Sequence, residues 1–348
     1  MSAGRFAPWY ADSMTTKNDA LAGALAADAV AMPVHWYYDR EALARDYGQI
    51  TSYLAPKNPH PDSILWRSSF APLNERADIL HDQARYWGQR SVHYHQFLAA
   101  GENTLNFQLA ACLYGQTVVL GRYDADAWLG FYIEFMLTPG RHRDTYVEEY
   151  HREFFTNYAR GRKPRACGVA DVHIGGLVPV PAMFCALDKT SADMPAAVQE
   201  HVALTHQDKG VLRAAECLVR ILAAVRAGEP LRDAILSHAS DWISKAKAVA
   251  WSQESDAVVV GRRLSPACYI PDAFPAALYL AWKYADDFGA GICANAQVGG
   301  DSCHRGAVVG SLLGEANGVP QRWQDGLLAR GGNPVTPTPS VPSEVVAR

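Results

Sequence analysis

Apolar residues recur along most of this chain at the spacing of an α-helix. The clearest stripe consists of Val211, Ala215, Leu218, Leu222 and Val225. Gly228 and Pro230 follow this stripe, as is typical just beyond a helix C-terminus. The pattern therefore predicts a long amphipathic helix that ends at Gly228.

Six other segments show the same periodicity, with residues at their ends that favour helix termini. We expect these helices at residues 18–32, 104–121, 124–138, 231–251, 273–288 and 302–317. Asp272 and Ser302 are the expected N-caps of the last two. The alternation typical of strands is nearly absent. The sequence therefore predicts an all-α fold.

Two of the expected helices have unusual faces. The segment 18–32 is apolar nearly all round, which indicates a helix at the centre of a bundle, yet it contains Asp28. A buried acid needs partners, so Asp28 is either satisfied by backbone and hydroxyl donors or supports a functional site. One face of the last helix carries three glycines, Gly306, Gly310 and Gly314. Because glycine lowers helix propensity, this face is expected to permit close approach of a neighbouring helix.

Composition and charge narrow the class of protein. The chain has 348 residues and a net charge of −4, and it has no basic stripe, so nucleic acid is not an expected partner. The longest apolar run, residues 20–34, is too short to span a bilayer, and no membrane association is expected. Seven scattered cysteines without C-x-x-C spacing, and a start unlike a signal peptide, favour a reducing, cytoplasmic location.

The domain organisation is expected to be simple. No internal repeat is evident, and the length allows one large domain, which we place at residues 15–330. Residues 331–348 are rich in proline, threonine and serine and are expected to form a disordered tail.

Two short segments bring polar residues to expected helix starts. Gly101-Glu102-Asn103-Thr104 is by itself a plain capping sequence, because Asn103 or Thr104 can cap and Glu102 suits the positive end of the helix dipole. The double glycine of Gly299-Gly300-Asp301-Ser302 makes a tight turn and directs N–H groups outward, where they can hold an anion such as a phosphate.

Together these motifs resemble those of the ADP-ribosylglycohydrolase family, which includes dinitrogenase reductase-activating glycohydrolase and J1-crystallin-like proteins. Four segments carry the resemblance: Asp28-Ala-Val-Ala-Met-Pro33, Gly101-Glu102-Asn103-Thr104, Leu204-Thr205-His206 and Gly299-Gly300-Asp301-Ser302-Cys303-His304. They match in order and spacing over about residues 21–323, which is most of the chain. The resemblance implies a compact orthogonal multi-helix bundle. It also implies hydrolysis of a glycosidic bond in a small-molecule or protein-linked ADP-ribosyl or ribosyl substrate.

The metal motifs of that family are altered here. Members carry T-D-D-T and G-G-D-x-D-T, which hold two magnesium ions. In this chain Glu102 and Asn103 stand for the aspartates of the first motif, and Cys303 and His304 replace the second aspartate and the threonine of the last. Magnesium prefers hard oxygen ligands, and only Glu102 and Asp301 remain as carboxylates. We therefore expect no two-magnesium centre.

Three interpretations of the altered motifs stay open. The first is a glycosidase with one metal or none, in which Glu102 and Asp301 flank the scissile bond and His304 carries a proton. The second is a non-catalytic ADP-ribose-binding or nucleotide-binding descendant of the family. The replacing residues are polar and titratable, which argues against a non-catalytic descendant, because a site without activity has no need of such groups.

The loop at residues 168–179 also lacks the family's Asn and Arg, so the substrate is expected to differ.

The third interpretation is a changed metal. Cys303, His304 and either His93 or His95 are softer ligands that suit zinc or iron. Adjacent residues point about 100° apart on a helix, which weakens Cys303 and His304 as joint ligands.

We take the first interpretation, a hydrolase-like enzyme, as the prediction. Its expected catalytic residues are Glu102, Asp301 and His304, and its expected substrate-binding residues are Asn103, Thr104, Gly299, Gly300, Ser302, Asp28, His35 and Trp36. No cofactor is expected; the alternatives are one magnesium ion held by Glu102 and Asp301, or zinc or iron. Because Asp301 is expected in a loop, its replacement by alanine is expected to cost little stability.

Overall fold

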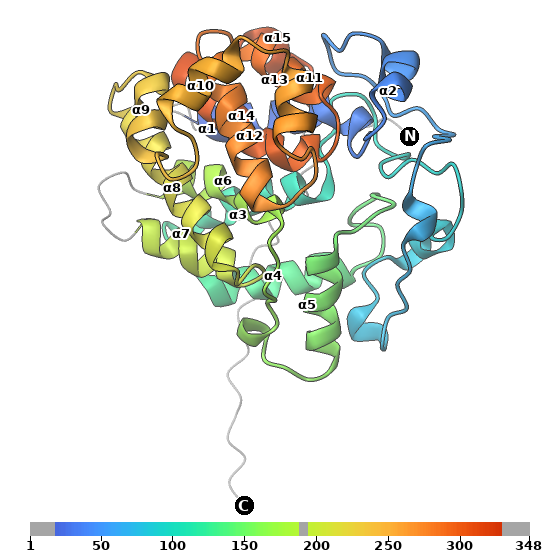
Figure 1. Ribbon diagram of the computed structural model, residues 1–348. Coiled ribbons are helices and arrows are strands. Elements are labelled where there is room, and N and C mark those ends of the chain that lie inside the picture. The colour runs from blue at the N-terminus through green and yellow to red at the C-terminus, as the bar shows by residue number, and fades with distance from the viewer. Residues whose placement is uncertain (1–17, 188–193, 329–348) are drawn as a thin grey trace, which may run out of the picture.

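The computed structural model describes residues 18–187 and 194–328, and these residues fold into a bundle of short helices (Figure 1). Within these ranges the only β-structure consists of isolated bridges, such as the one that pairs Tyr37 with Gly300. This architecture confirms the predicted all-α fold. None of the described helices is long and apolar enough to cross a lipid bilayer. The tail predicted at 331–348 lies outside the described residues.

Most helices follow one another through short connections, but a long one separates α2 from α3. In chain order they are α1 (Asp19–Ala31), α2 (Arg40–Tyr47), α3 (Leu105–Leu120), α4 (Ala125–Leu137), α5 (Glu149–Ala159), α6 (Pro179–Ala186), α7 (Met194–Ala203), α8 (Lys209–Arg226), α9 (Leu231–His238), α10 (Lys245–Ser252), α11 (Asp256–Val258), α12 (Ile270–Lys283), α13 (Phe288–Gln297), α14 (Ser302–Asn317) and α15 (Gln321–Asp325). Short 3₁₀ helices lie between them: η1 (Met32–Val34), η2 (Leu65–Arg67), η3 (Glu75–Ala77), η4 (His81–Tyr86), η5 (Pro164–Ala166) and η6 (Ile174–Leu177), together with the π-turn η7 (Val259–Arg263).

The two central helices, α1 and α14, lie in backbone contact through glycine. A Cβ atom built on Gly23 would lie 2.1 Å from the carbonyl oxygen of Gly310, and one built on Gly310 would lie 2.2 Å from the carbonyl oxygen of Gly23. Neither distance leaves room for a side chain. The glycine face predicted for the last helix is therefore confirmed as a surface of close helix packing, and its partner is α1.

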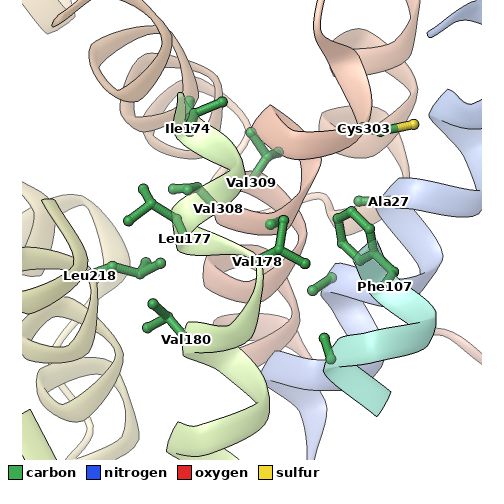
Figure 2. Close-up of a cluster of buried hydrophobic side chains, with 14 of the residues drawn as sticks. Ala27, Phe107, Ile174, Leu177, Val178, Val180, Leu218, Cys303, Val308 and Val309 are labelled. Atoms are coloured by element: carbon green, nitrogen blue, oxygen red, sulfur yellow. The ribbon is translucent and has the colours of Figure 1, made fainter. Parts of the chain in front are cut away.

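The core holds the starts of α3 and α14 together. Figure 2 shows Val308 and Val309 of α14 beside Val178, with Ala27 of α1 and Phe107 of α3 on the other side. All five side chains are at most 2% exposed. Fully burying one such aliphatic or aromatic side chain contributes roughly 1.5–3 kcal/mol. The polar motifs at the two helix starts are thus anchored by one apolar cluster.

Most expected helices occur where the periodicity places them, but the segments 231–251 and 273–288 differ from the prediction. The segment 231–251 was expected to be a single helix, and it forms α9 and α10 with a break between them. The break ends at Ser244, whose hydroxyl accepts a hydrogen bond from Lys247 N and so caps a new helix. The apolar pattern continues across this break, which is why periodicity alone did not reveal it.

The expected caps near the C-terminal end also need correction. Asp272 lies inside the first turn of α12, which begins at Ile270, so it is not the N-cap. That helix ends at Lys283, and a separate helix, α13, begins at Phe288 with the Asp287 carboxylate accepting from Ala290 N. At the start of α14 the N-cap position belongs to Asp301, one residue before the expected cap, Ser302.

Candidate active site

The turn that precedes α14 is built for close packing. Gly299 and Gly300 have positive φ angles of 67° and 65°, which residues other than glycine rarely adopt. A Cβ on Gly299 would lie 2.2 Å from the Tyr37 carbonyl oxygen, and one on Gly300 would lie 2.2 Å from the Pro266 carbonyl oxygen. The two glycines therefore let the segments before α2 and before α12 approach the start of α14.

The N–H groups of this turn are already used. Gly300 N donates to Tyr37 O at 2.7 Å, Asp301 N donates to Pro266 O at 2.9 Å, and Ser302 N donates to Gly300 O at 2.8 Å. The expectation that these amides point outward to an anion is therefore wrong. The turn instead fixes the Asp301 side chain at the head of the helix.

The Asp301 carboxylate lies in a cluster of imidazole rings. Its Oδ1 atom is 2.9 Å from Nε2 of His35 and 2.7 Å from Nδ1 of His304. All three residues are 0% exposed. Nε2 of His173 lies 3.4 Å from the other carboxylate oxygen, Oδ2, which has no hydrogen-bond partner among the described residues. The predicted residues Asp301, His304 and His35 are thus brought together.

His304 stands between two carboxylates. Its Nδ1 atom faces Asp301, and its Nε2 atom lies 3.3 Å from Oε1 of Glu148, the residue before α5. Burial alone would lower the pKa of His304, but the two carboxylates outweigh it and raise that pKa to about 10. Burial likewise opposes ionisation of the two acids. The imidazolium nevertheless holds the pKa of Asp301 well below its usual range and that of Glu148 at about 2. The three groups therefore form a buried anion–cation–anion triad.

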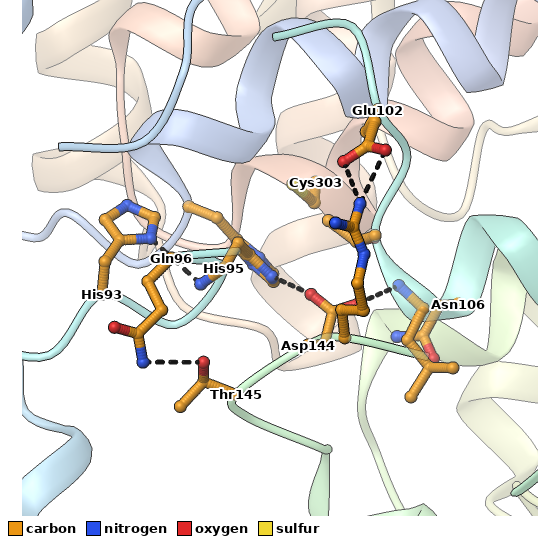
Figure 3. Close-up of polar contacts among 12 residues, drawn as sticks. His93, His95, Gln96, Glu102, Asn106, Asp144, Thr145 and Cys303 are labelled. Carbon is orange, nitrogen blue, oxygen red and sulfur yellow. Dashed lines mark hydrogen bonds and ion pairs between the residues drawn. The ribbon is translucent and has the colours of Figure 1, made fainter. Parts of the chain in front are cut away.

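A second chain of hydrogen bonds leads from Asp301 to Asp144. Nδ1 of His35 is 2.8 Å from Nε2 of His95, and Nδ1 of His95 is hydrogen-bonded to Asp144 (Figure 3). The other oxygen of Asp144 accepts from the backbone N of Leu105 at 2.7 Å. The chain thus joins the start of α14 to the first residue of α3.

Counting hydrogens shows that this chain holds an extra proton. Ionised carboxylates only accept, so the three links between Asp144 and Asp301 need three hydrogens, whereas two neutral imidazoles supply two. Burial lowers the pKa of His35 to about 3, against the opposing effect of Asp301, so His35 is neutral. The four groups therefore share one proton more than two neutral imidazoles and two carboxylates would carry.

Aromatic rings cover this network. Trp36 has a positive φ of 62°, and its ring stacks on His35 with centroids 3.7 Å apart. The edges of Tyr94 and Tyr146 then meet Trp36, each with centroids 4.8 Å away. Trp36, expected to bind substrate, thus shields His35 from solvent.

Glu102 lies outside this cluster, which corrects the expected pairing of Glu102 with Asp301. Its two oxygens accept from Nη2 of Arg143 at 2.7 and 2.6 Å (Figure 3). One oxygen also accepts from Ala99 N at 2.7 Å. Among the described residues, no group of close potential metal ligands contains both Glu102 and Asp301. Glu148, and not Glu102, is the second carboxylate in this cluster.

A separate buried cluster of hydrogen bonds joins Asp28 to Asn103 and Thr104. Asp28 Oδ2 accepts from Asn103 Nδ2 at 2.9 Å and from Thr104 N at 2.8 Å, while Oδ1 accepts from the Thr104 hydroxyl at 2.9 Å. Burial raises the pKa of Asp28, and these hydrogen bonds oppose the shift. This is the pattern of an acid satisfied by backbone and hydroxyl donors. It fastens α1 to the start of α3.

The donor set around Asp301 does not suit a pair of magnesium ions. Magnesium needs oxygen ligands in octahedral geometry, and the neighbours of Asp301 are the imidazoles of His35, His173 and His304. Both ring nitrogens of His35 and of His304 already lie within hydrogen-bond or ion-pair distance of side chains.

A softer metal on His173, Cys268 and Asp301, whose ligand atoms lie within 4.8 Å of one another, meets a different difficulty. Nδ1 of His173 accepts from Gly175 N at 2.8 Å, so the ring proton is on Nε2, the nitrogen that faces Asp301. A metal-bound imidazole normally donates through its other nitrogen. The expected soft ligand Cys303 also points elsewhere, because its Sγ atom contacts the backbone O of Asp28 at 3.7 Å.

Five contributors to the network were not selected from the sequence: Asp144, Glu148, Asn106, His151 and His173. The amide of Asn106 lies between Nε2 of His151, 2.7 Å from its Oδ1, and Nε2 of His304, 2.5 Å from its Nδ2. Because a protonated His304 donates, the amide must be turned so that its oxygen faces His304 and its NH2 group faces His151. A possible signal was the density of histidines, since 12 are present and most are buried. Buried imidazoles need polar partners, so acids close to them in the chain were candidates.

Comparison with known proteins agrees with this fold. The chain is similar to a solved structure described as an ADP-ribosylglycohydrolase-related protein complex, with a TM-score of 0.54 and 20% identity over 90% of this chain and 93% of that one. No curated protein matches the chain. The fold and the motifs at its helix starts define a helical protein of the glycohydrolase type. The model of the ADP-ribosylglycohydrolase family matches residues 18–336, and the chain therefore belongs to that family.

Proposed function

We propose that this protein hydrolyses an N- or O-glycosidic bond of an ADP-ribosyl or related ribosyl substrate, without a two-magnesium centre. The observation that carries the proposal is the position of His304, whose ring lies between Asp301 and Glu148. A fixed imidazolium there balances two carboxylates that would otherwise need a bound cation. Family membership supports the substrate class.

The two acids suit the charge that develops during glycoside cleavage. The anomeric carbon gains positive character in the transition state. Asp301 Oδ2 and Glu148 Oε2 are buried carboxylate oxygens without a hydrogen-bond partner among the described residues. Oriented anionic oxygens stabilise a developing cation more than a neutral substrate, and this difference accelerates the reaction.

In the proposal, His304 supplies the proton that the leaving group needs. Both acids are ionised near neutral pH, so neither can protonate a leaving group, whereas the raised pKa of His304 keeps its ring protonated. Beside Asp301, His173 is the histidine with some exposure, since 12% of its side chain is accessible whereas His35 and His304 are 0% exposed. Burial lowers the pKa of His173, so its ring is neutral; Nδ1 accepts from Gly175 N, and the proton on Nε2 faces Asp301. Substrate approaches Asp301 from this side in the proposal.

A second candidate function is binding of ADP-ribose without turnover. The observation that favours it is the closure of the network, because Asp301, His35 and His304 are all fully buried and hydrogen-bonded to one another. Such a network also stabilises a fold without any chemistry.

Turnover and binding measured side by side distinguish these candidates. Release of ADP-ribose from a panel of N- and O-linked ADP-ribosyl compounds reports the enzyme, and calorimetry with ADP-ribose reports binding. We expect turnover that falls at least about 100-fold in Glu148→Gln while ADP-ribose still binds. Binding without turnover in the wild type supports the second candidate. A wild-type protein that shows neither binding nor turnover would contradict both candidate functions.

A further inference from the structure

A second cluster of potential ligands lies away from Asp301, on the segment that follows α1. Asp46 is in the last turn of α2, and His60 and Asp62 lie in the irregular stretch that follows it. One ligand atom from each of these three side chains lies within 4.8 Å of the other two. The cluster joins residues that are separated by an extended loop.

The His60 side chain is the observation that points to a ligand. It is 1% exposed, and neither ring nitrogen has a hydrogen-bond partner among the described residues. A buried imidazole normally satisfies both nitrogens. One face of the His60 ring stacks on Tyr37 with centroids 4.0 Å apart, so the ring is held in place while its nitrogens are unpaired.

We infer that Asp46, His60 and Asp62 form a binding site for a divalent transition-metal ion of the zinc class. One imidazole nitrogen with two carboxylate oxygens is a mixed donor set that suits Zn²⁺ or Co²⁺ better than Mg²⁺. Burial lowers the pKa of His60 to about 4, so its ring is neutral and keeps a lone pair for the ion.

The charges around the cluster are compatible with such an ion. Arg45 now spans the two acids, with Nε 3.0 Å from Asp46 and Nη2 2.9 Å from Asp62. Its side chain is 57% exposed, so it can turn into solvent without leaving a buried charge. A divalent ion then balances the two carboxylates. Lys57 donates to the backbone carbonyl of Asp46 and need not move.

The site would fasten the loop to the framework of the candidate active site. Tyr37 stacks on His60, and the Tyr37 carbonyl accepts from Gly300 N, one residue before Asp301. An ion on His60 therefore restrains a residue that supports the turn before α14. The inference stands on its own donor set and does not depend on the proposed hydrolase activity.

Titration of the untagged, full-length protein with Co²⁺ tests the site, because Co²⁺ bound to nitrogen and oxygen ligands has visible d–d absorption. We expect one Co²⁺ per chain, displaced by Zn²⁺, and a higher Tm when Zn²⁺ is present. Asp62→Asn should weaken Co²⁺ binding at least about 10-fold. Asp62 is 40% exposed and forms its ion pair with Arg45, which is itself exposed, so this variant is expected to fold.

Asp78→Asn is the matched control. Asp78 is also an exposed aspartate beside a histidine, with its carboxylate 3.8 Å from His81, but this pair has no third ligand within the described parts of the chain. Co²⁺ binding should be unchanged in that variant. His60→Gln gives a second test of the same ligand set. Absence of d–d absorption in the wild type, or equal binding by wild type and Asp62→Asn, would overturn the inference. Loss of the Co²⁺ spectrum in Cys268→Ser but not in Asp62→Asn would also overturn it, because the ion would then lie beside Asp301.

Discussion

Asp301 and His304 lie one helical turn apart at the start of α14, and their side chains meet with Oδ1 2.7 Å from Nδ1. Residues three apart share a face of a helix, so this pair forms as soon as the first turn forms. The partners that complete the network, the ionised Glu148 and the neutral His35, come from distant parts of the chain. The site is thus a local ion pair extended by tertiary contacts.

Replacing Asp301 should cost both activity and stability. Asp301→Asn removes the negative charge from between two buried imidazoles and leaves the His304 imidazolium with one carboxylate. Breaking a buried pair typically costs about 3–5 kcal/mol. The expectation of little stability loss, which rested on a loop position, is therefore withdrawn. Urea unfolding measures the change. Asp287→Asn is the control, an exposed N-cap aspartate whose capping role asparagine retains; equal stabilities of the two variants would contradict the prediction.

The stability that His304 supplies should depend on pH. Its pKa is about 10 in the folded protein, against an ordinary value of 6.5, so the contribution is complete below about pH 6.5 and is lost as the pH rises towards 10. The pKa values of Asp301 and Glu148 are lowered, so their contribution is present above about pH 4.5 and is lost as the pH falls. We expect the Tm difference between wild type and His304→Gln to narrow between about pH 6.5 and 10. A constant difference would argue against a buried imidazolium.

Glu102 should matter for stability more than for chemistry. Glu102→Gln weakens the contact with Arg143, whose side chain is 41% exposed, and we expect a loss of about 1–2 kcal/mol. Turnover should fall much less than in Glu148→Gln, because Glu148 and not Glu102 faces His304. Steady-state kinetics of the two variants compare them directly. A larger loss in Glu102→Gln would restore Glu102 as the catalytic acid.

The contact between α1 and α14 should not tolerate a methyl group. In Gly23→Ala the new Cβ would meet the Gly310 carbonyl oxygen at 2.1 Å, so the helices must separate, at a cost of about 3 kcal/mol or more. Gly115→Ala is the matched control, since a Cβ on this helical glycine of α3 has no neighbour within 4 Å. That change should stabilise the protein by about 0.4–1 kcal/mol. Thermal unfolding of both variants distinguishes the steric effect of the methyl group from its effect on helix propensity. Equal Tm changes in the two variants would contradict the prediction.

Chelator treatment should leave most turnover intact. The proposed mechanism uses the His304 imidazolium as its cation, so removal of divalent ions by EDTA leaves the charges around Asp301 in place. Activity before and after dialysis against EDTA is the measurement. Complete loss that returns on addition of Mg²⁺ would re-establish metal-dependent catalysis at this site.

Much of the fold could be predicted because it rests on local patterns. The boundaries of α1, α3, α4 and α8 follow from apolar periodicity and from capping residues such as Asp124, whose carboxylate accepts from Asp126 N and Ala127 N. The glycine face of α14 was also readable, since three glycines in one helix need a packing reason. The break before α10 could not be predicted, because Ser244 caps a helix inside a continuous apolar pattern.

Only those contacts of the site that lie within one sequence motif could be predicted. Asp301 and His304 stand in one motif, so their meeting follows from helix geometry. Glu148 lies far from that motif in the chain, and nothing in its own neighbourhood distinguishes it from the adjacent Glu149. Glu102 has the right place in its motif, but the sequence contains no sign that Arg143 lies close enough to pair with it. Long-range polar partners depend on tertiary packing that periodicity does not report.

The backbone contact between Gly23 and Gly310 limits how the chain can vary in evolution. Inserting or deleting one residue in α1 or α14 rotates everything beyond it by about 100°. Such a change before Asp28 would turn this acid away from Asn103 and Thr104, and one at the start of α14 would turn His304 away from Glu148. Substitutions at these helix starts can accumulate, as the altered motifs illustrate, while length changes within the two helices are excluded. Insertions are therefore expected in the long connection between α2 and α3 and not in the central helix pair.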